Sequence, residues 1–117
     1  MKARLVTILV AATLCVSQNY RAIAQSNDPK SANFMMQGCR NFASETAGDS
    51  GFMGGWCAGI LDGITYMDPD LCIPDGVPQA QVARVVVQYI DQRPARMHES
   101  FKLLAIEALR SAWPCQR

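Results

Sequence analysis

The sequence has 117 residues, half of them hydrophobic, with 11 basic and 10 acidic side chains. This length predicts a single domain. The basic residues form no cluster, which argues against a nucleic-acid-binding protein, because phosphate backbones require stripes of Lys and Arg.

Residues 1–24 have the organisation of a cleaved secretory signal peptide. Lys2 and Arg4 provide a basic start, and residues 5–16 form an apolar run without a charged side chain. Residues 22–24 place alanine at the two positions that a signal peptidase reads, which predicts cleavage before Gln25. The apolar run is too short for a bilayer core of roughly 30 Å, which needs about 20 residues. An uncleaved N-terminal anchor remains the alternative.

The mature part, residues 25–117, is predicted to be one exported domain. Its eight basic and ten acidic side chains give a net charge of −2. It contains no apolar segment that is long enough to span a membrane. At 93 residues it is near the lower end of what a single core stabilises alone.

Four cysteines in the mature part predict a disulfide framework. Cys39, Cys57, Cys72 and Cys115 are an even number in a small exported chain, and four cysteines allow three connectivities. No pair has C-x-x-C spacing and His98 is the only histidine, so the pattern fits no zinc site. We expect neither a metal nor another cofactor.

The first half of the mature chain predicts two helices and a loop. The first helix starts at Pro29, which follows the capping sequence Ser-Asn-Asp, and it ends before a break at Gly48 and Asp49. The second helix covers residues 52–66. A proline-containing loop follows over residues 67–77.

The second half predicts two more helices. The third opens at Pro78 and ends at Pro94, and the fourth runs from Met97 to the stop at Pro114. Apolar residues recur at helical spacing in both: Val82, Val85, Val86, Tyr89, Ile90, Phe101, Leu104, Ala105, Ala108 and Leu109. The expected fold is all-α, a small four-helix domain of two helical hairpins with two disulfides.

The hairpins suggest which cysteines pair. In an antiparallel hairpin, residues equidistant from the turn lie opposite each other. Cys39 and Cys57 are each nine residues from Gly48, and Cys72 and Cys115 are centred on the junction of the third and fourth helices. We therefore predict the bridges Cys39–Cys57 and Cys72–Cys115. Crossed bridges that tie the two hairpins together remain possible.

Glycine recurs every fourth residue in the second helix, at Gly51, Gly55, Gly59 and Gly63. Each glycine in a helix interior costs up to about 1 kcal/mol relative to alanine, so such a row needs a compensating contact. We expect the row to allow close packing against another helix of the chain. The alternative is a groove for a second copy or another partner.

Catalytic chemistry is not indicated. A Cys–His nucleophile needs a free thiol, and the four mature cysteines are better explained as disulfides. His98 lies beside Glu99 and has no cluster of metal-ligand residue types around it in the sequence. We therefore do not expect an enzyme.

The loop over residues 66–78 is the best candidate for a partner-binding surface. It is acidic, stiffened by prolines and tethered at Cys72, so it loses little conformational entropy on docking. A plain connector is the alternative. The residues that we expect to contact a partner are Tyr66, Asp68, Asp70 and Asp75.

A set of motifs follows in a fixed order between residues 34 and 115. After Cys39, these motifs are W-C-A-G-I-L-D-G-I at 56–64, L-C-I-P-D-G-V at 71–77, V-V-x-Y-I at 86–90, R-P at 93–94, and A-L-x-x-A-W-P-C at 108–115. This ordered set resembles the Rap/Tai family of immunity proteins of bacterial type VI secretion. The family's cysteines map onto the four mature cysteines. Its glycines map onto Gly59 and Gly63, as scaffold positions.

The resemblance implies a periplasmic antitoxin. Its relatives are small helical proteins, often dimeric, that bind a peptidoglycan amidase and block its active site. Contact residues vary with the toxin and are not carried over. A periplasmic chaperone-like or stress protein that binds unfolded clients is the alternative, because flexible methionine side chains suit promiscuous binding.

Overall fold

The computed structural model describes residues 28–44 and 50–116 of the chain. Its elements are the helices α2 (Ala32–Ala43), α3 (Gly51–Met67), α4 (Gln79–Asp91) and α5 (Phe101–Ala112), with a short 3-10 helix, η1 (Pro94–Arg96), before α5. The predicted signal peptide and the predicted break at Gly48 and Asp49 lie outside the described residues. Among the helices described, none is long and apolar enough to cross a membrane.

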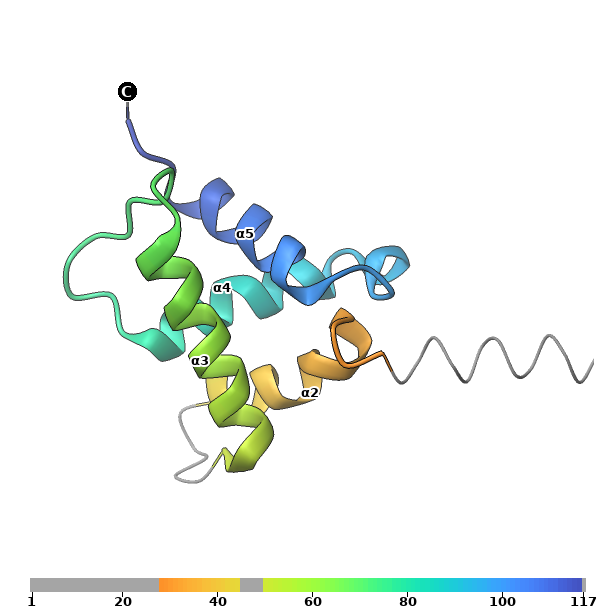
Figure 1. The fold of residues 1–117 in the computed structure, drawn as a ribbon. Helices are drawn as coiled ribbons and strands as arrows, with labels where there is room; N and C mark the ends of the chain where they lie inside the picture. Colours follow the sequence, from red (N-terminus) through yellow and green to blue (C-terminus); the bar gives the residue numbers. More distant parts are fainter. Residues whose placement is uncertain (1–27, 45–49, 117) are drawn as a thin grey trace, which may run out of the picture.

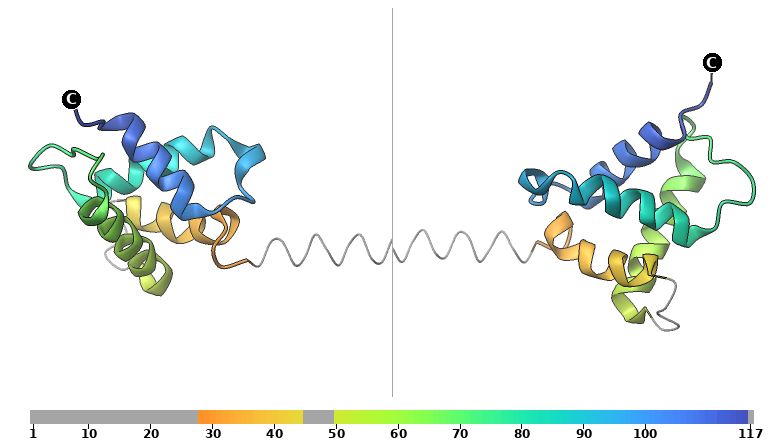
Figure 2. Two further views of the ribbon diagram at one scale, coloured as in Figure 1. Left: turned by 45° about the horizontal axis from the view of Figure 1, so that its top comes forward. Right: turned by 180° about the vertical axis from the view of Figure 1, so that it is seen from behind.

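The four α-helices form two hairpins that pack on one another, as the sequence predicts (Figure 1). α2 packs against α3, α4 packs against α5, and the contact between α2 and α4 joins the two pairs. Figure 2 shows that α3 runs along one side of this assembly, and that the long loop after it begins beside the C-terminal end of α5 and runs to the start of α4. α3 therefore has one side on the core and one side away from it.

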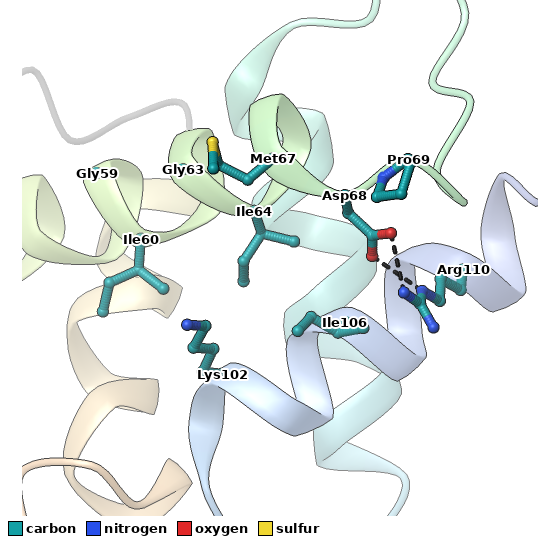
Figure 3. A pocket seen from close by; sticks show the side chains of 10 residues that line it. All are labelled: Gly59, Ile60, Gly63, Ile64, Met67, Asp68, Pro69, Lys102, Ile106 and Arg110. Atoms are coloured by element: carbon teal, nitrogen blue, oxygen red, sulfur yellow. Dashed lines mark hydrogen bonds and ion pairs between the residues drawn. The ribbon is translucent and has the colours of Figure 1, made fainter.

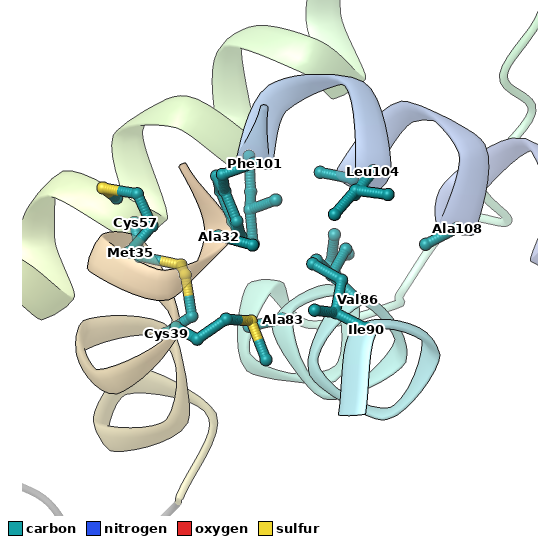
Figure 4. Close-up of a cluster of buried hydrophobic side chains, with 14 of the residues drawn as sticks. Ala32, Met35, Cys39, Cys57, Ala83, Val86, Ile90, Phe101, Leu104 and Ala108 are labelled. Atoms are coloured by element: carbon teal, nitrogen blue, oxygen red, sulfur yellow. A yellow bond between two sulfur atoms is a disulfide. The ribbon is translucent and has the colours of Figure 1, made fainter. Parts of the chain in front are cut away.

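The core lies where the inner faces of all four helices meet (Figure 4). Phe101 and Leu104 of α5 face Met35 of α2 and Val86 of α4, and all four side chains have an exposure of 1% or less. Burial of such side chains contributes about 1.5–3 kcal/mol each. The other fully buried members are Ala32, Met36, Cys39, Cys57, Leu61, Ala83, Ile90, Ala105, Ala108 and Leu109.

Both disulfides have the predicted pairing. Cys39 of α2 bonds Cys57 of α3, with 5.2 Å between their Cα atoms. Cys72, in the loop after α3, bonds Cys115, beyond the end of α5, with 4.9 Å between Cα atoms. Each bridge thus closes one hairpin, and the crossed pairing is excluded.

Two predicted helix starts are wrong. α2 begins at Ala32 rather than Pro29, and α5 begins at Phe101 rather than Met97. The cause is a backbone pairing between the two segments: the Ala32 N–H donates to the Glu99 carbonyl (2.9 Å) and the Phe101 N–H donates to the Lys30 carbonyl (2.8 Å). Backbone groups used in this pairing are held outside the helices.

Ser31 is the residue that caps α2. Its hydroxyl accepts a hydrogen bond from the Phe34 N–H at 3.4 Å and donates to the Asp28 carbonyl at 2.7 Å. Its side chain is buried, with 1% exposure. A serine before the first turn satisfies a backbone donor that the helix leaves open.

Candidate partner-binding surface

The loop between α3 and α4, residues 68–78, is fixed to the C-terminal end of the chain. Beside the Cys72–Cys115 disulfide, the Cys72 N–H donates to the Trp113 carbonyl at 3.0 Å, and Leu71 forms an antiparallel bridge with Pro114. Partly buried apolar side chains also anchor the loop on the core: Leu71, Ile73 and Val77. The loop is therefore stiff, as expected from its prolines and its cysteine.

Asp68 joins α3 to α5 through an ion pair with Arg110, whose own side chain is 47% exposed. Arg110 of α5 donates from Nε to Oδ2 at 2.8 Å and from Nη2 to Oδ1 at 2.9 Å, and the Asp68 side chain is only 7% exposed. The hydrogen bonds from Arg110 lower the pKa of the Asp68 carboxyl, and the bond from the Asp70 N–H lowers it further. The structure thus places one predicted contact residue in an internal ion pair.

The other three predicted contact residues face outward. The Tyr66 ring, at the C-terminal end of α3, is 88% exposed. Asp70 lies 3.6 Å from Arg110 at the outer side of the same ion pair, with its side chain 41% exposed. Asp75 is exposed at a turn where Gly76 has a φ of +85°, a conformation that favours glycine. These residues lie along one stiff segment, but the structure does not gather them into a single pocket.

The predicted close packing of the glycine row within the chain is wrong. A Cβ added at Gly51, Gly55, Gly59 or Gly63 would meet no atom within 4 Å among the residues described. A spacing of four places residues on one side of a helix but does not say which side faces the core. Here the row lies on the outer side.

Close helix packing occurs instead at Gly38, which lies outside that row. A Cβ on Gly38 would lie 2.5 Å from the Met53 carbonyl oxygen of α3, whereas a Cβ on Gly54 would lie 2.3 Å from the Cβ of Ser50, the N-cap residue of its own helix. Gly38 adjoins Cys39, whose bridge to α3 needs a short distance between the helix backbones. Proximity to the paired cysteines was the sequence signal for Gly38.

The outer side of α3 exposes large apolar side chains. Phe52 is 82% exposed, Met67 76% and Trp56 38%. Trp56 packs edge-on against Phe34, with 6.1 Å between ring centroids, and tilted against Phe52 at 5.9 Å. Sequence reasoning missed this surface because it considered the glycines without the aromatic residues between them.

An open groove of about 540 Å³ separates this part of α3 from α5 (Figure 3). Ile60, Ile64 and Ile106 line it, and the Lys102 side chain extends from α5 toward Ile60. The ion pair of Asp68 with Arg110 lies at its other end. The groove has an apolar lining and offers no acid–base pair.

The titratable side chains elsewhere serve structure. Arg96 of η1 donates to both oxygens of Glu99 at 2.8 and 2.7 Å and to Glu107 of α5 at 2.7 Å, which lowers the pKa of each carboxyl. All four cysteines in the described part of the chain are disulfide-bonded. In residues 28–44 and 50–116, no three His, Cys, Asp or Glu side chains are grouped so as to hold a metal ion.

A comparison with protein families matches residues 30–115 to the Rap1a immunity proteins. The chain belongs to this family. No curated protein and no solved structure matches the chain. The match covers every described helix, so the Rap1a family includes both hairpins and the loop between them.

The residues that carry the Rap1a resemblance have two different positions. The four cysteines and the apolar residues of α4 and α5 lie in disulfides or in the core. Gly59 and Gly63 instead lie on the outer side of α3, so the structure gives them no role in packing within the chain.

Proposed function

We propose that this Rap1a family member is a periplasmic immunity protein that binds a peptidoglycan amidase effector and inhibits it without catalysis of its own. Membership of the immunity family carries the proposal. The two disulfides support export to an oxidising compartment. The absence of a free thiol among the described residues is consistent with action by binding.

The loop over residues 66–78 is the surface that we propose for the effector. It is fixed at Cys72 and by Asp68, so its backbone is already ordered before binding. A preordered surface avoids part of the entropic cost of association. Asp70 and Asp75 present carboxylates on it, and Tyr66 lies at its border with α3. The carboxylates suit a basic rim around the effector's active-site cleft.

The test of inhibition uses the mature chain, purified from the bacterial envelope, and candidate wall amidases of the same strain. A stoichiometric complex with one amidase and loss of its hydrolytic activity is expected. Asp75→Ala should weaken this complex by about tenfold. The matched control is Gln88→Ala, at an exposed position of α4 outside the loop, which should leave affinity unchanged. Recovery of many unfolded clients without inhibition of any amidase would support the chaperone-like alternative.

Export is tested separately by N-terminal sequencing of the protein recovered from the periplasm. A chain that starts at Gln25 is expected. A chain that retains Met1 and sediments with membranes would support the uncleaved anchor. This result does not depend on which effector is bound.

We also propose that the protein forms a homodimer, which its resemblance to dimeric relatives implies. The exposed apolar side of α3 supports this, because contiguous apolar surface on a protein of this size marks an interaction site. Sedimentation of the mature chain at micromolar concentration tests it.

A further inference from the structure

α3 is apolar on all sides although only one side faces the core. Among its 17 residues, Asp62 is the only charged one. Its buried side consists of Gly54, Cys57, Leu61 and Ile64. A helix that is hydrophobic all round is normally buried all round, so the outer side of α3 needs a covering partner.

The exposed area on this side is close to what a dimer interface uses. Phe52, Tyr66 and Met67 are each more than three-quarters exposed, and Trp56 adds 38%. At roughly 200 Å² for a fully exposed side chain of this size, they present about 600 Å² per copy. A standard interface takes about 800 Å² from each partner. The residues between and around these side chains supply the difference.

Five positions on this side are symmetric about Gly59, whereas Trp56 and Met67 lie outside this symmetric set. Gly55 and Gly63 are each four residues from Gly59, and Phe52 and Tyr66 are each seven residues from it. Positions 52, 55, 59, 63 and 66 therefore carry an aromatic residue, three glycines and an aromatic residue, the same order from either end. Their spacings of 3, 4, 4 and 3 residues are those of a contact line between two packed helices. Two helices related by a perpendicular two-fold axis run antiparallel, and residue i of one then meets j of the other while j meets i.

We infer that two copies of the chain pack α3 against α3, antiparallel, with the two-fold axis at Gly59 and Phe52 of each copy against Tyr66 of the partner subunit. The inference rests on the homodimer proposed above and specifies its interface. It explains the glycine row, because absent Cβ atoms let two helix backbones approach closely. Among residues 28–44 and 50–116, no atom lies within 4 Å of a Cβ added at Gly55, Gly59 or Gly63.

A second copy fits this surface better than the effector does. Binding of an effector does not require a symmetric order of residues along α3. In a parallel pair of α3 helices, each residue would lie against the same residue of the partner subunit, whatever the order of residues. The symmetric order of these five positions favours the antiparallel pair. Tyr66 then belongs to the subunit contact, and Asp70 and Asp75 remain on the loop for the effector.

Engineered cysteines in the full mature chain test the register. A residue on the two-fold axis faces its own copy, so Gly59→Cys should give a disulfide-linked dimer under oxidising conditions. Phe52→Cys and Tyr66→Cys should each give little linked dimer alone and a linked heterodimer when mixed. The control is Leu103→Cys, at a 59% exposed site on α5, which should stay unlinked. Peptide mapping of the two native disulfides confirms that each variant is folded.

A charged side chain at the axis should separate the subunits without unfolding them. In the described part of the chain, no atom lies within 4 Å of the Cβ that Gly59→Arg adds, so helix formation is not impeded. Substitution of a central interface residue weakens association by about 30-fold or more, and in a two-fold dimer the change enters twice, which gives on the order of a thousandfold. Sedimentation should show a monomer with an unchanged helical circular dichroism spectrum.

The outcomes separate this inference from the proposals on which it rests. A dimer that fails to link through Gly59→Cys would overturn the interface and leave the homodimer standing. Linking of Phe52→Cys to itself would overturn the antiparallel register. A monomer at all concentrations would overturn both the interface and the homodimer. Inhibition of an amidase is measured on the same preparations and stands or falls independently.

Discussion

Mild reduction of the folded protein should open the Cys72–Cys115 disulfide well before the Cys39–Cys57 disulfide. Cys72 is exposed and Cys115 half-buried, whereas Cys39 and Cys57 have no exposed surface. Thiol–disulfide exchange requires a thiolate to reach a sulfur atom. The inner bridge is therefore open to attack only in molecules whose α2–α3 hairpin has separated.

The free energy of opening the α2–α3 hairpin sets the difference in rate. When opening costs about 5 kcal/mol, roughly one molecule in several thousand is open. The initial rate of reduction at Cys39–Cys57 should therefore be on the order of a thousandfold below that at Cys72–Cys115. Dithiothreitol treatment, followed by quenching with iodoacetamide at early times and mass analysis of the peptides, measures both rates. Comparable initial rates, or earlier opening of the inner bridge, would refute the reasoning.

Replacing both cysteines of a bridge by alanine measures how much that disulfide contributes to the free energy of unfolding. The Cys72–Cys115 bridge spans 43 residues and the Cys39–Cys57 bridge 18. The chain-entropy relation gives contributions of about 4 and 3 kcal/mol respectively. Loss of Cys39–Cys57 also removes two buried sulfur atoms, so its measured cost in urea unfolding should exceed the entropic value. If loss of the outer bridge costs nothing, the backbone bonds at Cys72 alone close the loop.

Three further predictions concern single side chains. Gly38→Ala should destabilise the protein, because its Cβ would lie 2.5 Å from a backbone oxygen. Gly55→Ala adds a Cβ in open space and should stabilise the helix of the monomer by about 0.5–1 kcal/mol. Thermal unfolding of the two variants compares these effects. The lowered pKa of Asp68 stabilises the fold above about pH 4, and this contribution is lost as pH falls through the lowered value. Arg110→Ala should therefore cost most at neutral pH, and this cost should shrink as the pH falls below about 4 and through the lowered pKa of Asp68. Urea unfolding over this pH range measures it, and a cost that does not change with pH would contradict the ion pair's role. Ser31→Ala should cost about 1 kcal/mol through loss of the cap, and an unchanged midpoint of unfolding would exclude it.

The helices and the disulfides could be predicted because their signals are local or symmetric. Apolar spacing in residues 79–91 and 101–112 fixes which side of each helix is buried. Equal distances from a turn place Cys39 opposite Cys57. The helix starts could not be predicted, because Ala32 and Phe101 are held by backbone bonds to residues about 70 positions away in the chain. Such a pairing leaves no local pattern.

The candidate site was predicted less well, for a related reason. Asp68 read as a solvated acidic residue, and its role as an anchor depends on Arg110, which is 42 residues later. The glycine row was assigned to the wrong side of α3 because spacing gives a side but not its direction. The buried side is set by Cys57, Leu61 and Ile64, whose spacing of 4 and 3 residues marks the core side of a helix.

The two sides of α3 meet different structural requirements. Its inner side must accept the Cys39–Cys57 bridge and the core, and this accounts for Gly54, Cys57 and Leu61. Nothing within the chain accounts for the outer side, where glycines that weaken the helix alternate with exposed aromatic rings. Glycines that cost helix stability and leave open space above them among the described residues are suited to a close contact with another molecule. The outer side of α3 is therefore the surface that we propose for the contact between subunits.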